Sequence, residues 1–187
     1  MEALTLLRIQ AHANRLANHR LHGAMAALSN EDLHAPRTSF FPTLMGTLNH
    51  ILEVDVFYTG VLHRDADLAT WWDRFVPATA LEDLAERQRV SDEQLITWLM
   101  AADGAALDAT VHIPRDGGRR TQVDRAAHLL QHLFMHQTHH RGQAHAMLAG
   151  TAVAPPQLDE FLMPSEPHLR VPDMAALGWA EAGVYPR

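Results

Sequence analysis

TQVDRAAHLLQHLFMHQTHHRGQAHAMLAG, residues 121–150, is the stretch that indicates the fold most clearly. Thr121 and Asp124 have the spacing of a helix capping box, and glycine, here Gly150, commonly follows the last turn of a helix. Apolar residues, among them Leu129 and Leu133, recur at helical spacing between these two signals. The stretch therefore predicts one helix from about residue 121 to residue 149. Its histidine-rich block is HQTHHRGQ, residues 136–143.

Three further segments have the helical pattern of apolar residues. The first covers about residues 3–28. The second covers about residues 43–63 and follows Pro42, a residue tolerated at a first helical turn. The third covers about residues 81–104, and Thr79 and Glu82 at its start have capping-box spacing. Between the third and fourth segments, VHIPRDGGRRTQV, residues 111–123, has β-branched ends around a Gly-Gly pair, so a short hairpin is expected there.

Four helices with almost no strand predict an all-α fold, a four-helix bundle. The connection between the second and third helices is long, and a long crossover allows two successive helices to run parallel. We therefore expect an up-down-down-up order. Residues 151–187 carry six of the ten prolines, which indicates a tail lying over the bundle, with a short helix around residues 173–177. The predicted organisation is one domain over residues 1–187, with the bundle at about 3–150.

Composition excludes several classes of protein. The chain has 187 residues, and its formal net charge of -7 disfavours binding to nucleic acid, because phosphate backbones repel an acidic surface. No run of 18 apolar residues and no signal-peptide pattern is present, so we expect no membrane association and a cytoplasmic protein. Without cysteine, a metal would have to take nitrogen or oxygen ligands. The 14 histidines are about three times the number expected from typical composition.

Five of these histidines lie within an arc of about 120° on the predicted fourth helix, at positions 128, 132, 136, 139 and 140. His136 and His140 are one turn apart on the side nearer the apolar stripe, so their rings can hold one ion. We expect His128, His132 and His139, on the outer side of the arc, not to be ligands. The alternative is that the pair is an ordinary hydrogen-bonded feature, since an i, i+4 pair arises often by chance in a histidine-rich chain.

A third ligand must come from another helix, because a catalytic metal normally takes three protein ligands. His50 lies midway along the second helix on a largely inward-facing side, and a buried histidine needs a partner. A neighbouring hydroxyl or carbonyl would serve as well as a metal. Glu53 and Asp55 rank below His50 because they point away from it. The histidines near helix ends or on the mixed face of the first helix are expected to be solvated: His12, His19, His22 and His63.

Several segments together resemble the DinB/YfiT-like family. They are HQTHHRGQAHAML in the fourth helix, GTLNHILEVDVFY in the second, HANRLANHRL in the first and APPQLDEFLM after the bundle, and the resemblance covers roughly residues 10–163. It implies an up-down-down-up bundle, often dimeric, with a divalent metal on three histidines. Carried over by motif, these are His50, His136 and His140. It also implies zinc, nickel or iron as the metal, and enzymes of the family that use bacillithiol or mycothiol.

The chemistry expected of such a site is activation of a thiol or of water. A neutral three-histidine site leaves the ion with most of its charge, and the ion can then bind a small thiol as thiolate. Arg141 is a candidate for a carboxylate of that thiol, although it can equally pair with an acid or cap the surface. Gln143 is a candidate outer-shell partner. A hydrolase and a non-catalytic metal-binding stress-response protein remain open. We also expect a homodimer acting on a small molecule.

Overall fold

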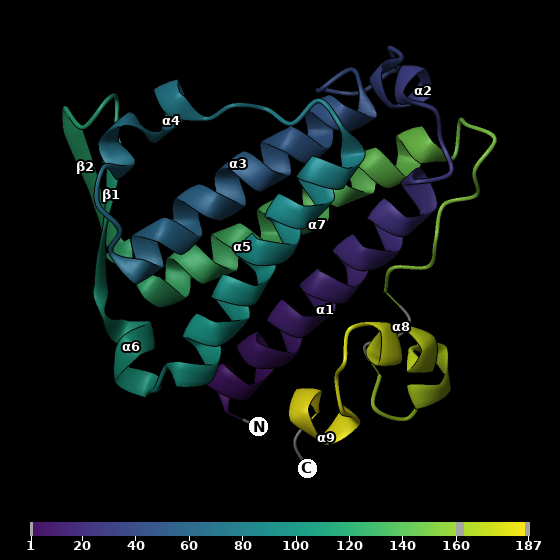
Figure 1. Ribbon diagram of the computed structural model, residues 1–187. Helices are drawn as coiled ribbons and strands as arrows, with labels where there is room; N and C mark the ends of the chain where they lie inside the picture. The colour runs from purple at the N-terminus through teal and green to yellow at the C-terminus, as the bar shows by residue number, and fades with distance from the viewer. Residues whose placement is uncertain (1, 160–162, 186–187) are drawn as a thin grey trace.

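The computed structural model describes residues 2–159 and 163–185, and it is mostly helical (Figure 1). Its four long helices are α1 (Ala3–Met25), α3 (Leu44–His63), α5 (Leu81–Ala101) and α7 (Ala126–Leu148). Short helices lie in the connections: α2 (Asn30–His34), η1 (Leu68–Thr70), α4 (Trp71–Arg74) and α6 (Gly104–Asp108). The expected all-α class is confirmed.

Contacts between the long helices establish their directions. Asn49, Asp55 and Leu62 of α3 meet Ala78, Gln88 and Trp98 in the same order along the chain, so α3 and α5 are parallel. Near the start of α1, Arg8 donates to the carbonyls of Leu99 and Ala102 at the end of α5, so α1 and α5 are antiparallel. In Figure 1, α1 and α7 run one way and α3 and α5 the other, which fits the expected order.

Helix boundaries differ from the predicted ones where capping spacing was used. Thr43 caps α3 by accepting a hydrogen bond from the Gly46 N–H. The N-cap of α5 is Ala80, without a side-chain cap, so the capping box expected at Thr79 and Glu82 is absent. α1 ends at Met25, three residues before the expected end.

The fourth long helix begins at Ala126, because residues 120–125 are taken by a strand. Strands β1 (Thr110–Arg115) and β2 (Arg120–Arg125) pair antiparallel, with Val111 opposite Asp124. Their turn holds Gly117 and Gly118 at φ 65° and 82°, a region that glycine adopts without strain. The expected hairpin is confirmed, and it replaces the predicted first turn of the helix.

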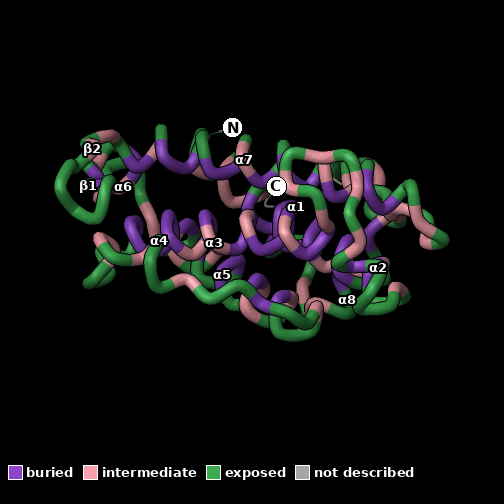
Figure 2. The backbone as a smooth tube through the Cα atoms, turned by 90° about the horizontal axis from the view of Figure 1, so that it is seen from above, coloured by how far each residue is buried: buried purple, intermediate pink, exposed green. Residues whose placement is uncertain are grey.

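Apolar side chains fill the bundle in two clusters. One surrounds Phe57, Leu99 and Leu130 at the hairpin end, and the other surrounds Leu21, Leu52 and Leu148 at the opposite end. In Figure 2, residues coloured as buried recur along the long helices. No helix among the described residues is long and apolar enough to cross a membrane.

The chain after α7 returns to α1, where the described part of the tail packs. It contains η3 (Pro167–Leu169), α8 (Val171–Ala176) and α9 (Glu181–Val184), and α8 confirms the short helix expected near residue 173. Met174 and Val184 pack with Leu16, and Arg20 of α1 pairs with Asp173 at 2.6 Å. Residues 160–162 of the APPQLDEFLM segment lie outside the described residues.

Candidate metal centre

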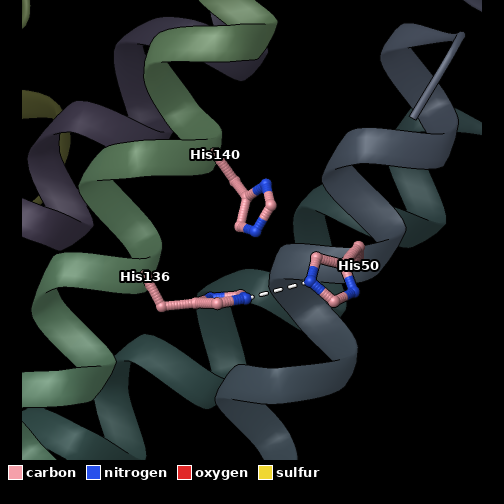
Figure 3. Close-up of side chains that lie close together, drawn as sticks. All are labelled: His50, His136 and His140. Carbon is pink, nitrogen blue, oxygen red and sulfur yellow. Dashed lines mark hydrogen bonds between the residues drawn. The ribbon is translucent and has the colours of Figure 1, made fainter. Parts of the chain in front are cut away.

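His50 of α3 and His136 and His140 of α7 form one cluster (Figure 3). Each offers a nitrogen atom, and these atoms all lie within 4.8 Å of one another. His136 Nε2 and His50 Nε2 are hydrogen-bonded at 3.0 Å, and the His50 and His140 ring centroids are 4.6 Å apart. The three residues predicted from the sequence are therefore brought together.

Helix geometry explains the cluster. His136 and His140 project from one face of α7 because they are four residues apart, and α3 packs antiparallel against that face. The position of His50 along α3 sets its ring opposite both (Figure 3). Phe41, in the segment before α3, covers the group, with its ring centroid 4.3 Å from that of His50 and 5.7 Å from that of His140.

The cluster favours unprotonated imidazoles. Burial, and then the neighbouring histidines, lower the pKa of His136 to about 3. Burial and His140 lower the pKa of His50 to about 4. Burial also lowers the pKa of His140, against the opposing effect of its hydrogen bond to Gln143. Near neutral pH all three rings carry free lone pairs, which is the state that binds metal.

Gln143 orients one ring of the cluster. Its Oε1 lies 2.8 Å from His140 Nδ1, which can donate to it and thereby leave His140 Nε2 as the ligand atom. Gln143 Nε2 lies 3.3 Å from His139 Nε2, so one amide connects the two neighbouring histidines. His136 differs, because its Nδ1 is buried without a hydrogen-bond partner among the described residues. The ring orientation of His136 is therefore set by packing and by its contact with His50.

The other histidines lie outside the cluster. His128, His132 and His139 are exposed and are not in the group of possible ligands found among the described residues. On α1 the expectation of solvated histidines is wrong for two residues. His12 and His22 are each 8% exposed, and Trp179 of the tail packs against the ring of His12. His63 is exposed as expected, and His19 is half-buried.

A buried polar network beside the cluster escaped the sequence reasoning. Asn14 and Asn18 of α1 donate to Asp92 at 3.0 Å, and Gln88 bridges Asp92 and Asp55 at 3.0 and 2.7 Å. Gln137 Nε2, next to His136 in the chain, donates to Asp55 at 2.9 Å. The spacing of Asn14 and Asn18, one turn apart on the inward face of α1, was the available signal.

Arg141 belongs to this network. Its guanidinium is buried and donates to the side-chain oxygens of Asn14 and Asn18, the latter at 3.1 Å. Burial lowers the pKa of Arg141, whereas Asp92 and Asp55 act in the opposite direction. The geometry thus places Arg141 with asparagines and acids of the interior. It gives no support to the expected contact between Arg141 and a ligand of the three histidines.

Comparison with known protein families gives a match to the DinB family over residues 6–169. This range contains α3, α5 and α7 in full, all of α1 except its first three residues, and the three histidines. The chain belongs to the DinB family. A DinB-family relative, Protein DinB of Bacillus subtilis (strain 168), is 27% identical over 156 residues, covering 80% of this chain and 89% of that protein. The resemblance read from the sequence motifs is confirmed, and a three-histidine group in a DinB-family chain fits a metal-binding protein.

The Gln143 contact gives a first prediction. Replacing Gln143 with Leu removes the acceptor for His140 Nδ1, so the ring is no longer held with Nε2 toward the cluster. Metal affinity should fall by ~10- to 100-fold, the usual effect of losing an outer-shell partner. A competition titration with a chromophoric chelator measures it. Gln131, exposed on the same helix, is the matched control, and equal affinities for Gln143→Leu and Gln131→Leu would contradict the assignment.

Proposed function

We propose that this DinB-family protein binds one divalent metal ion through His50, His136 and His140 and is a metal-dependent enzyme that activates a small thiol. The transfer of that thiol to an electrophile, or an isomerisation that uses it, is the reaction class. The observation that carries the proposal is the convergence of three unprotonated imidazoles from two helices, with nitrogen atoms within 4.8 Å. Zinc, nickel and iron all accept imidazole nitrogen.

The donor set fits such an ion. Two Nε2 atoms of neutral rings face each other at 3.0 Å, where at most one can be protonated for a hydrogen bond. A shared cation would satisfy both lone pairs, and the His140 ring, held by Gln143, would supply the third. When bound, the ion would supply a positive charge that stabilises an anionic ligand such as a thiolate.

The residues of the chain would then have distinct tasks. The three histidines would hold the ion, Gln143 would keep the Nδ1 proton of His140 in place, and Phe41 would exclude water from one side. The chain has no cysteine, so the thiol nucleophile would be a separate small molecule. This supports a thiol co-substrate.

A hydrolase that activates water is the main alternative, and a non-catalytic metal-binding stress-response protein is the other. A hydrolase needs a general base beside the metal. Asp55 is an inner carboxylate of α3, but its Oδ2 accepts from both Gln88 and Gln137, away from the cluster. Homodimer formation and a cytoplasmic location stay predictions.

Cobalt substitution tests the proposed function. The protein is purified without a nickel column and loaded with Co²⁺. It is then titrated with bacillithiol, mycothiol and glutathione. We expect a sulfur-to-cobalt charge-transfer band with at least one of them, and consumption of that thiol when an electrophile is added. The control is the His136→Ala, His140→Ala variant, which should give no band.

Two outcomes would count against the thiol proposal. Absence of the band with all three thiols, with hydrolysis of simple esters or amides, would favour the hydrolase. Absence of both activities in protein that retains the metal would favour the non-catalytic alternative.

A further inference from the structure

Arg15 and His22 are buried polar side chains of α1 for which no hydrogen bond is found among the described residues. Arg15 and His22 are each 8% exposed and lie seven residues apart, on the same side of α1. The Arg15 Nε atom is buried and has no hydrogen-bond partner, and within the described residues no acceptor is found for either side chain. A buried guanidinium without an acceptor is costly unless a ligand supplies one.

Both side chains line one cavity of about 630 Å³ between α1, α5 and α2. Of these, α2 lies beside the end of α1, at the end of the bundle opposite the hairpin (Figure 1). Much of the remaining lining is small or apolar and includes Ala26, Leu28, Leu33, Leu81 and Ala85. The cavity thus combines one buried cationic group with apolar walls, the usual composition of a small-molecule site.

Charge around the cavity limits the kind of ligand. Arg89 also lines it, but its guanidinium is paired with Glu86 and Glu93, each at 2.6 Å. Arg15 forms no close ion pair within the part of the chain that is described, and its charge acts on the carboxylates of Asp92 and Glu86 from a longer distance. Glu82 and Glu86 lie on the cavity wall and would repel a second negative charge. The charges around the cavity therefore favour a ligand with no more than one negative charge, placed at Arg15.

We propose that this cavity binds a small monocarboxylate with an apolar body, with Arg15 as the anchor of the carboxylate. The planar guanidinium suits the two carboxylate oxygens. His22 would add one N–H donor, and the apolar body would lie against Leu33 and Leu81. Burial, then the charges of Arg15 and Arg141, lower the pKa of His22 to about 3, so its ring is neutral and does not compete for the anion.

Titration of the full-length protein with hexanoate, followed by two-dimensional NMR, tests the proposal. We expect saturable binding with a dissociation constant of about 0.1–1 mM, and shifts concentrated in α1, α2 and the start of α5. Hexanamide has the same shape without the charge, and hexyl phosphate carries up to two charges. Both should bind roughly 10-fold more weakly or worse.

Two variants separate Arg15 from a general effect. Arg15→Met should weaken hexanoate binding roughly 30-fold, and Arg15→Lys, which keeps the charge without the fork, roughly 5-fold. Arg8→Lys is the matched control, because Arg8 lies one heptad earlier on the same side of α1 and does not line the cavity. It should leave the affinity unchanged. Arg15→Lys keeps the test valid if Arg15→Met does not fold.

The histidine cluster must be excluded as the binding site, since a metal ion also binds carboxylates. The same titration is therefore repeated with the His136→Ala, His140→Ala variant. Equal affinity for hexanoate in that variant would support a site separate from the metal centre. No saturation up to about 10 mM, equal affinity for hexanamide, or shifts centred on α7 would overturn the proposal.

Discussion

The double substitution His136→Ala, His140→Ala is expected to abolish specific metal binding. These residues supply two of the three nitrogen ligands and leave His50 as a single donor. Loss of an outer-shell partner already weakens metal sites by ~10- to 100-fold, so loss of two ligands should lower the affinity by more than about 1,000-fold. Elemental analysis after purification without a nickel column should give about one metal ion per wild-type chain and a negligible amount in the variant.

The control is a second i, i+4 pair on the same helix. His128→Ala, His132→Ala removes as many imidazoles from α7, but both residues are exposed and outside the cluster. This variant should keep the wild-type metal content. Loss of metal in the control alone would place the site elsewhere.

Replacing Arg141 with Met is expected to produce the largest loss of stability. The substitution removes one of the two guanidinium charges that act on the buried Asp92, the other being that of Arg15, and it leaves the oxygens of Asn14 and Asn18 without their donor. Removing one member of a buried charged group costs about 3–5 kcal/mol. Chemical denaturation in the presence of a chelator, which removes any contribution from bound metal, measures the free energy of unfolding.

Two further variants identify the origin of that loss. Arg119→Met, at an exposed position in the hairpin turn, should change stability by no more than about 0.5 kcal/mol. The double variant Arg141→Met, Asp92→Asn should recover part of the loss, because the uncompensated carboxylate is then gone. If Arg141→Met were as stable as Arg119→Met, the network would have no structural role. If it remained stable but lost affinity for thiol, the ligand role first considered for Arg141 would return.

Periodicity predicted the long helices well because most of their stability comes from the buried apolar face that creates the pattern. The capping signals at Thr121 and Thr79 failed for different reasons. Thr121 pairs with Pro114 in the hairpin, a contact between strands that local spacing does not report. At Thr79 the chain enters α5 one residue later, at Ala80. At Thr121, capping-box spacing is therefore a weaker predictor of the helix start than the pairing of the two strands.

The histidine cluster was predictable because the two signals for it, spacing along a helix and a family motif, are both local in the sequence. His136 and His140 share a helix face by spacing, and His50 lies on an inward side within a family motif. Burial of His12 was not predictable in the same way, since Trp179, which packs against it, comes from a distant part of the chain. The contacts of Asn14 and Asn18 with Asp92 likewise depend on how α1 and α5 pack.

Diffraction measured on both sides of the absorption edge of the bound metal is the most direct test of the central claim. The anomalous difference map should contain one strong peak per chain, within ~2.0–2.2 Å of a nitrogen atom of each of His50, His136 and His140. A peak bonded instead to His128, His132 or His139, or no peak in protein shown by elemental analysis to contain metal, would contradict it.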